Sequence, residues 1–215
     1  MTLRILPNSA GAWVRLCISV AILAIVGVCF HADAVVGSWF YAKEEGDILF
    51  QSLPHGELVD AIEGITGSPW SHCGVLMKRD RHWVVVEALG EVRETPLTDW
   101  IVRSRRGHFA AYRLKTMPTD GHERLKTALG QFMGRPYDFE YAPDDRAIYC
   151  SELAYKAYDV ALQRKLGTWE KLGDLDWKAF EPFIRRMEGG KLPLDRPMIT
   201  PAGLARSSEL AQVYP

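Results

Sequence analysis

The sequence predicts a single α+β domain, and three observations lead to this fold class. Apolar patterns typical of strands are grouped between residues 46 and 114. After residue 115 the apolar spacing changes to that of helices. The 215 residues, 47% of them apolar, suit one globular domain with a core of its own. Strands and helices separated in this way favour an antiparallel sheet, or a small barrel, packed against helices.

The first 34 residues are expected to be a targeting segment that precedes the domain. Arg4 and Arg15 come before an uninterrupted apolar run of 15 residues, Leu16–Phe30, and Ala32-Asp33-Ala34 resembles a signal-peptidase site. The run is shorter than the roughly 20 residues of a spanning helix, which favours a cleaved signal peptide over a membrane anchor. Both alternatives export the domain, residues 35–215. We therefore expect it in the periplasm or cell envelope, either released there by cleavage or held at the inner membrane by its N-terminal segment.

The strand region contains five short strands and two short helices. The strand candidates are bounded by turn residues and cover 46–50, 71–77, 82–89, 91–94 and 109–114. The polar turn Lys78–Arg81 predicts that the second and third of them form a hairpin. The helices are expected near 55–65 and after Thr98, which can cap the helix that follows it.

The rest of the chain is expected to be helical apart from its loops. One helix follows Asp120 and ends at Gly134-Arg135-Pro136, where a loop rich in Tyr and Asp begins. A second helix starts near Cys150 and is expected to stop at Gly167. Residues 176–187 have the spacing of a last amphipathic helix, and a tail punctuated by proline follows.

Charge and cysteine usage exclude several classes of protein. The 26 basic and 27 acidic residues give a formal net charge of −1, so the chain lacks the basic excess of a nucleic-acid-binding protein. Four cysteines are too few for a disulfide scaffold, and only Cys73 and Cys150 lie beyond the targeting segment. Metal-binding spacings such as C-x-x-C or H-E-x-x-H and a phosphate-binding glycine loop are missing. We therefore expect neither a metal nor a cofactor.

Cys150 is the strongest candidate nucleophile. It follows a loop and stands at the expected start of a helix, where unpaired N–H groups and the helix dipole favour a thiolate. The same N–H groups are suited to stabilise an oxyanion beside the sulfur. The alternative is a buried cysteine that packs as a small apolar residue.

His72 and Glu87 are the candidate partners of this thiol. His72 opens a strand, and alternation directs it to one face together with Gly74 while Cys73 points to the other face. Alternation thus argues against a Cys73–Cys150 disulfide if His72 faces Cys150. Glu87 interrupts an apolar strand, and the hairpin brings it beside His72, where a carboxylate would fix the imidazole. The alternatives are a histidine bonded locally and a charge on an edge strand.

The ordered motifs resemble the circularly permuted papain-like enzymes of the NlpC superfamily, and among them the YiiX-like group. The similarity covers about residue 44 to the end and rests on Gly46–Phe50, Ser71–Val75, Glu87, Gly134–Asp138, Tyr149–Leu153 and Ile199–Ser207. The resemblance implies a permuted papain-like fold with Cys150 as nucleophile, His72 as general base and acid, and Glu87 as orienting group. It also implies that Tyr137 and Tyr149 line the cleft, although packing explains both equally well.

The expected function is a cysteine peptidase or amidase that cleaves an amide bond through a thioester. An envelope location favours a cell-wall peptide or an amino-acid amide as substrate. One alternative is a lipid-directed amidase, phospholipase or acyltransferase that uses the same triad, and this reading gains if Trp70 lines the cleft. The other is a non-catalytic envelope binding module, in which the three side chains do not converge.

Overall fold

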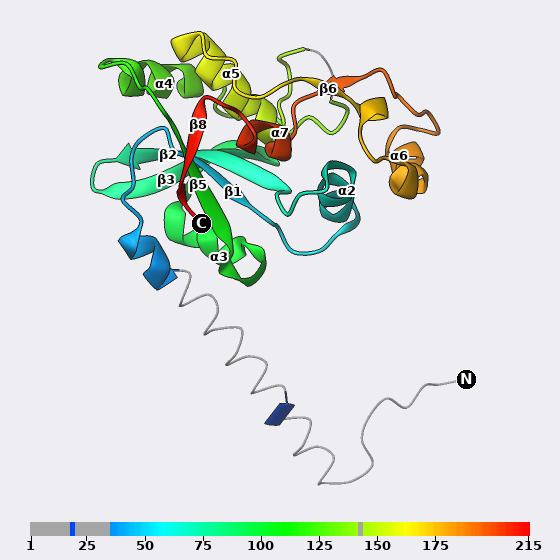
Figure 1. Ribbon diagram of the computed structural model, residues 1–215, viewed down its shortest axis with the longest axis horizontal. Helices are drawn as coiled ribbons and strands as arrows, with labels where there is room; N and C mark the ends of the chain where they lie inside the picture. The colour runs from blue at the N-terminus through cyan, green and yellow to red at the C-terminus, as the bar shows by residue number, and fades with distance from the viewer. Residues whose placement is uncertain (1–17, 20–34, 142–143) are drawn as a thin grey trace.

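The computed structural model describes residues 18–19, 35–141 and 144–215, which form an α+β domain with an antiparallel sheet at its centre (Figure 1). The main sheet has the order β4-β3-β2-β1-β5-β8. Its strands are β1 (Ile48–Gln51), β2 (His72–Arg79), β3 (His82–Leu89), β4 (Glu91–Pro96), β5 (Phe109–Leu114) and β8 (Leu210–Tyr214). A short ribbon pairs β6 (Glu170–Lys171) with β7 (Pro197–Met198). The helices are α2 (Glu57–Thr66), α3 (Leu97–Arg103), α4 (Gly121–Gly130), α5 (Cys150–Leu162), α6 (Glu181–Met187) and α7 (Pro201–Ala205).

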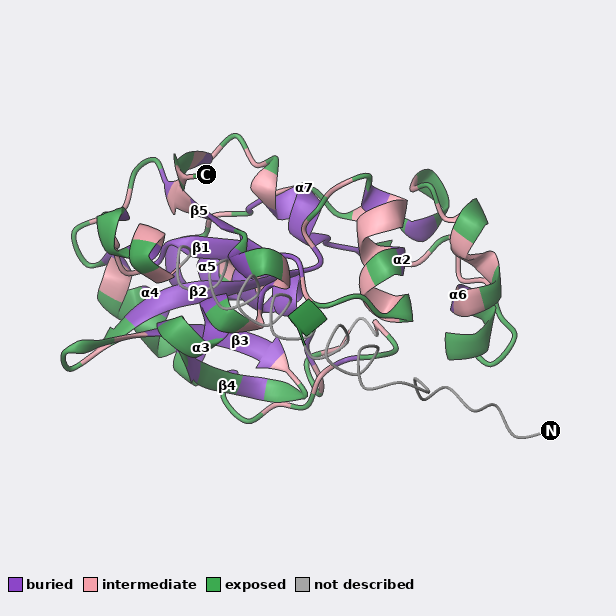
Figure 2. Ribbon diagram, turned by 90° about the horizontal axis from the view of Figure 1, so that it is seen from below, coloured by how far each residue is buried: buried purple, intermediate pink, exposed green. Residues whose placement is uncertain are grey.

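The two faces of the sheet are covered by different helices. One face packs against α4, α5 and α7, and alternate residues of β2, namely Cys73, Val75 and Met77, belong to this core. The other face packs against α3, where Trp100 and Leu76 belong to a second core. Figure 2 shows the buried strands between these layers. The alternation expected for β2 is therefore confirmed, because successive side chains enter opposite cores.

The sheet is open, with β4 and β8 at its edges among the described strands, so the arrangement is an antiparallel sheet and not a closed barrel. The predicted hairpin of β2 and β3 forms with Val75 opposite Val86. Glu87 lies in β3, which is paired on both sides. The edge-strand explanation for this charge is consequently wrong.

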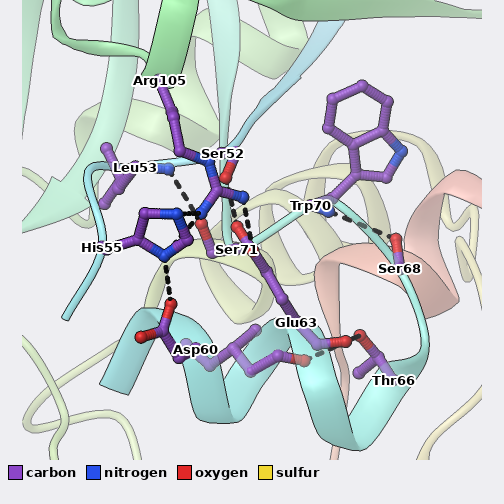
Figure 3. A network of polar contacts seen from close by, with 11 residues as sticks. Ser52, Leu53, His55, Asp60, Glu63, Thr66, Ser68, Trp70, Ser71 and Arg105 are labelled. Atoms are coloured by element: carbon purple, nitrogen blue, oxygen red, sulfur yellow. Dashed lines mark hydrogen bonds and ion pairs between the residues drawn. The ribbon is translucent and has the colours of Figure 1, made fainter. Parts of the chain in front are cut away.

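A third apolar cluster stands at one end of the sheet. It joins α2, α6 and the β6–β7 ribbon through residues such as Leu172, Ile184 and Met198. Polar contacts fasten α2 to the sheet: Glu63 accepts hydrogen bonds from Ser52 and from Arg105, the latter at 2.6 Å (Figure 3). As a result, α2 is held beside the start of β2.

Several element boundaries differ from the sequence predictions. The helix α3 begins at Leu97, directly after Pro96, and not behind a Thr98 cap, because Pro96 supplies a suitable fixed φ before the first turn. The helix α5 ends at Leu162 and is capped by Gln163 in a left-handed conformation (φ 56°), so it stops before Gly167. The tail adds β8 to the sheet, which was not predicted.

The targeting segment lies outside the described residues except for 18–19. In the part of the chain that the structure describes, none of the helices has the length and apolar character needed to cross a membrane.

Candidate active site

The β2–β3 hairpin brings His72 and Glu87 together in the interior. The Nε2 atom of His72 lies 2.5 Å from Oε2 of Glu87. One register step from the Val75–Val86 pair, Gly74 faces Glu87: a Cβ atom on Gly74 would lie 2.5 Å from the Val85 side chain and 3.2 Å from Cβ of Glu87. The glycine therefore leaves the space through which the carboxylate reaches the imidazole diagonally across the two strands.

Two further side chains hold the Glu87 carboxylate. The Thr95 hydroxyl on β4 donates a hydrogen bond of 2.6 Å to Oε1, and Nη2 of Arg103 in α3 donates one of 2.5 Å to Oε2. Neither residue was identified from the sequence. Thr95 lies on the strand paired with β3, so the register of β3 and β4 is a signal for it. Arg103 comes from a helix whose packing only the fold reveals.

Cys150 is the first residue of α5, and Tyr149 before it is extended, so the thiol lies where the first helical N–H groups have no partner within the helix. The start of α5 is tied to the segment before α7. Ser151 donates a 2.8 Å hydrogen bond to the Ile199 carbonyl, and the Ile199 N–H donates one of 3.0 Å to the Tyr149 hydroxyl. These bonds fix the end of the helix that carries the sulfur.

The three predicted residues converge. Cys150, His72 and Glu87 are only 3%, 2% and 0% exposed, so their interactions are little screened by water. The Cys150 sulfur lies near enough to His72 and Cys73 for both to influence its charge. The neighbouring Cys73 side chain lowers the pKa of Cys150 and burial raises it. The neighbouring His72, with its positive charge, lowers the pKa again, to well below its usual range. This arrangement favours a thiolate beside an imidazolium.

The same contacts set the charge of the other two groups. Burial lowers the pKa of His72. The neighbouring Cys150 and the Glu87 carboxylate, which accepts a hydrogen bond from the ring, outweigh burial and raise this pKa to about 9. Burial raises the pKa of Glu87, but the hydrogen bond and charge of His72, with further hydrogen bonds from Arg103 and Thr95, lower it to about 2. Both ions therefore persist at neutral pH.

Cys73 points to the face of β2 that packs against α5, as alternation predicts, and Cys150 lies in the same core. Both cysteines are free thiols, and each is a cause of the shifted pKa of the other. His72 is the first residue of β2, and Cys150 is among the groups that raise the pKa of its ring. Two consecutive residues of β2 thus both influence the charge of Cys150.

A mainly apolar pocket of about 820 Å³, including the open space at its mouth, leads to Cys150. Its walls come from α2, α6, the 137–141 loop and the segment around Met198–Pro201, and they include Ala61, Ile62 and Ile184. At its edge, Arg196 and Glu188 form a two-point ion pair at 2.6 and 2.7 Å, so these charges neutralise one another. The pocket therefore suits an apolar group better than a charged one.

The three predicted substrate-binding residues divide into two groups. Tyr137 and Tyr149 line the pocket, and burial raises the pKa of both, which keeps them neutral. Trp70 packs instead against Phe50, with 6.4 Å between the ring centres, and is not among the pocket's lining residues. In the ranges described, no three His, Cys, Asp or Glu side chains gather as a metal site requires.

Comparison with known proteins places this geometry in a family. Residues 42–214 match the model of a family described as permuted papain-like amidase enzymes, YaeF/YiiX, C92. The chain belongs to this family. The protein is accordingly an amidase-type hydrolase by family, and the predicted fold class, a permuted papain-like α+β fold, is confirmed.

Two relatives from Escherichia coli agree with this assignment. The uncharacterized protein YiiX of strain K12 is 28% identical over 181 residues, which covers 83% of this chain and 89% of the relative. A crystal structure described as metalloprotein yiiX, from strain O157:H7, superposes with a TM-score of 0.76 at 29% identity and covers 80% of this chain and 98% of its own.

Proposed function

We propose that the family member hydrolyses an amide bond through a thioester on Cys150. The Cys150 thiolate attacks the carbonyl carbon and forms a tetrahedral intermediate in which the C–N bond is still intact. The backbone N–H of Cys150, at the start of α5, stabilises the oxyanion of this intermediate. His72, which has taken the thiol proton, gives it to the leaving amine as the bond breaks. Water then attacks the thioester with His72 as base and releases the acid.

The observation that carries this proposal is a buried imidazole that is bonded to a buried carboxylate and lies near the thiol. Glu87 acts through His72: it fixes the ring and stabilises the imidazolium that forms in each half-reaction. The convergence of the three side chains supports catalysis over the non-catalytic binding module, which requires them to be apart.

The test compares the wild type with Cys150→Ala on aminocoumarin amides, with release of the fluorescent amine as the measurement. We expect turnover to disappear in Cys150→Ala while the circular dichroism spectrum is unchanged. Hydrolysis at the wild-type rate in Cys150→Ala would overturn the mechanism.

The apolar pocket favours the lipid-directed alternative over a peptide or an amino-acid amide. Its lining from α2 and α6 is apolar, and its two main charges are paired with one another. We propose that the acyl part of the substrate is an aliphatic chain seated between these helices. Trp70, whose position at the cleft would have supported this reading, does not contribute to it.

Acyl-chain length provides the test of this substrate class. Burial of each methylene is worth about 0.8 kcal/mol, so kcat/KM is expected to rise about fourfold per methylene from acetyl to octanoyl amides until the pocket is full. Ala61→Phe fills the pocket and should abolish this dependence, whereas the matched control Val160→Phe, on the exposed side of α5, should keep it. Faster cleavage of alanyl or dipeptidyl amides than of octanoyl amides would favour the peptide substrate instead.

Export and membrane association stay proposals that rest on the first 34 residues. The basic flank, the apolar run and the small residues at 32 and 34 support cleavage before residue 35. N-terminal sequencing of the protein recovered from the host tests it: a chain that begins at residue 35 in the soluble envelope fraction is expected. An intact N-terminus in the membrane fraction would favour the anchor.

A further inference from the structure

The helix α2 forms one wall of the apolar pocket but takes no part in the two main cores of the domain. Its apolar residues at helical spacing line the pocket, namely Leu58, Ala61, Ile62 and Ile65. Among the described residues, neither of the cores on the two faces of the sheet contains a residue of α2. The apolar contacts of α2 go instead to the third cluster, to which both Ile65 and Phe180 belong.

These contacts fix α2 relative to the α6 region and not relative to the sheet. A Cβ atom on Gly64 would lie 2.1 Å from the Phe180 ring, so α2 closely approaches the segment before α6. The Asp176 N–H donates a 3.1 Å hydrogen bond to the Ile65 carbonyl near the end of α2. The contacts that hold this wall at its distance from the catalytic side chains must therefore lie on the other side of α2.

The polar side of α2 is tied to the sheet through one carboxylate. Glu63 accepts a hydrogen bond from the Ser52 hydroxyl and one of 2.6 Å from Nη2 of Arg105 (Figure 3). The backbone N–H of Arg105 donates a bond of 2.7 Å to the Ser52 carbonyl, so the two donors to Glu63 are bonded to one another. Nη1 of Arg105 lies 2.9 Å from Nε2 of His55, whose Nδ1 is 2.7 Å from the Asp60 carboxylate. The Arg105 and Glu63 side chains are 25% and 14% exposed, so water screens their ion pair only in part.

The segment that holds Glu63 is also bonded beside the general base. The Leu53 N–H donates a 2.9 Å hydrogen bond to the Ser71 hydroxyl, and the Ser71 N–H donates one of 3.2 Å to the Gln51 carbonyl. Ser71 directly precedes His72. Arg105 thus connects the pocket wall to the strand end that carries the catalytic imidazole.

We propose that Arg105 is a positioning residue that sets the specificity of the pocket, because its ion pair with Glu63 holds α2 at the distance from Cys150 at which an aliphatic chain fits. Arg105 is not among the residues that line the pocket, so it acts through α2. Loss of the guanidinium leaves Glu63 with the Ser52 hydroxyl alone and allows α2 to move with α6. This inference rests on the proposed function, because it concerns the seat of the acyl chain.

The test compares two thiol reagents of different chain length, N-methyl and N-octyl iodoacetamide, on the full chain. Peptide mass mapping gives the rate of alkylation at Cys150 separately from that at Cys73. In the wild type the octyl reagent is expected to react faster, because its chain enters the pocket. In Arg105→Met the ratio of the octyl rate to the methyl rate should fall about tenfold, as for loss of a hydrogen bond between charged groups, while the methyl rate is unchanged. Arg105→Lys keeps the charge and should recover part of this ratio.

The matched control is Arg79→Met. Arg79 forms an ion pair of 2.5 Å with Glu94, the two side chains are 32% and 31% exposed, and neither lines the pocket. Arg79 is the last residue of β2, at the opposite end from His72. Arg79→Met should therefore leave the ratio of the two rates unchanged. A general loss of stability in Arg105→Met would lower both rates together and not the ratio.

The outcomes separate the role of Arg105 from the proposed function. An equal ratio in the wild type and Arg105→Met, or an equal fall in Arg105→Met and Arg79→Met, would overturn the role of Arg105 and leave the aliphatic substrate standing. Equal rates of the two reagents in the wild type would overturn the aliphatic pocket and this proposal with it. Should Arg105→Met fail to fold, Glu63→Gln, which keeps the size of the side chain, makes the same comparison. Alkylation does not require hydrolysis, so a ratio that falls in Arg105→Met without amidase turnover in the wild type would reject the proposed function and leave the role of Arg105 standing.

Discussion

Replacement of Glu87 by Gln removes the charge that supports the His72 imidazolium but keeps the size of the side chain. In the wild type the pKa of His72 is about 9 against an ordinary 6.5, a difference of about 2.5 pH units. At about 1.36 kcal/mol per pH unit, this difference means that the site favours the charged ring over the neutral ring by roughly 3 kcal/mol. This net value already includes the cost of burial, and the favourable part of it comes from Cys150 and Glu87 together. In Glu87→Gln that cost remains and one of the two partners is lost. We therefore expect the pKa of His72 to fall to 6.5 or below.

The assay is the pH dependence of kcat/KM and of Cys150 alkylation. Since the thiolate is paired with the imidazolium, the alkaline limb of the wild-type profile is expected near pH 9, and in Glu87→Gln it should move below pH 7. Loss of up to 3 kcal/mol corresponds to a decrease on the order of a hundredfold in kcat/KM near pH 8. An unchanged alkaline limb in Glu87→Gln would refute the assignment of Glu87 as the partner that supports the imidazolium.

The same pair makes the free energy of unfolding depend on pH at both ends. The pKa of Glu87 is depressed from 4.5 to about 2, so its stabilisation is present above pH 4.5 and is lost as the pH falls towards 2. The pKa of His72 is raised, so its stabilisation is complete below pH 6.5 and is lost as the pH rises through 9. Thermal unfolding midpoints across these two windows should change less in Glu87→Gln than in the wild type.

Three other substitutions test the supports of the site and of the fold. Arg103→Met removes a hydrogen-bond donor to the Glu87 carboxylate and should lower kcat/KM about tenfold, with partial recovery in Arg103→Lys. Equal kcat/KM values in the wild type and Arg103→Met would contradict the role of this bond. Gly74→Ala places a Cβ atom 2.9 Å from the Val86 carbonyl oxygen and against the Val85 side chain, so the free energy of unfolding in urea should decrease by about 1–3 kcal/mol. An unchanged free energy of unfolding would show that the strand has room for the methyl group. Arg113→Met leaves the buried Asp47 without the guanidinium that binds it at 2.6 and 2.8 Å, and should lower the free energy of unfolding in urea by about 3 kcal/mol. A decrease below about 1 kcal/mol would show that the hydrogen bond from Tyr41 is a sufficient partner for Asp47.

The parts of the site that the sequence predicts are those governed by local pattern. The hairpin of β2 and β3 follows from alternation and a polar turn, and its register alone brings Glu87 diagonally to His72. Cys150 is predictable because a loop that gives way to a helical apolar pattern marks a helix start. The family resemblance added the order of the three residues along the chain.

The remaining parts depend on packing between segments far apart in the sequence. Arg103 reaches Glu87 only because α3 folds under the sheet, and the apolar pocket exists only because α2 packs near α6, more than 100 residues later. Alternation assigned Cys73 to the right face but could not show that α5 begins over it. The strand β8 was missed because a short edge strand in a tail with proline is defined by its partner β5.

The most direct test of the central claim is to trap the acyl group on the enzyme. The wild type is mixed with an octanoyl aminocoumarin amide, quenched in acid within the first turnover, and mapped by peptide mass. The account predicts an octanoyl thioester on the peptide that contains Cys150, and neither the adduct nor turnover in Cys150→Ala. Steady hydrolysis with no adduct on Cys150, together with activity in Cys150→Ala, would contradict it.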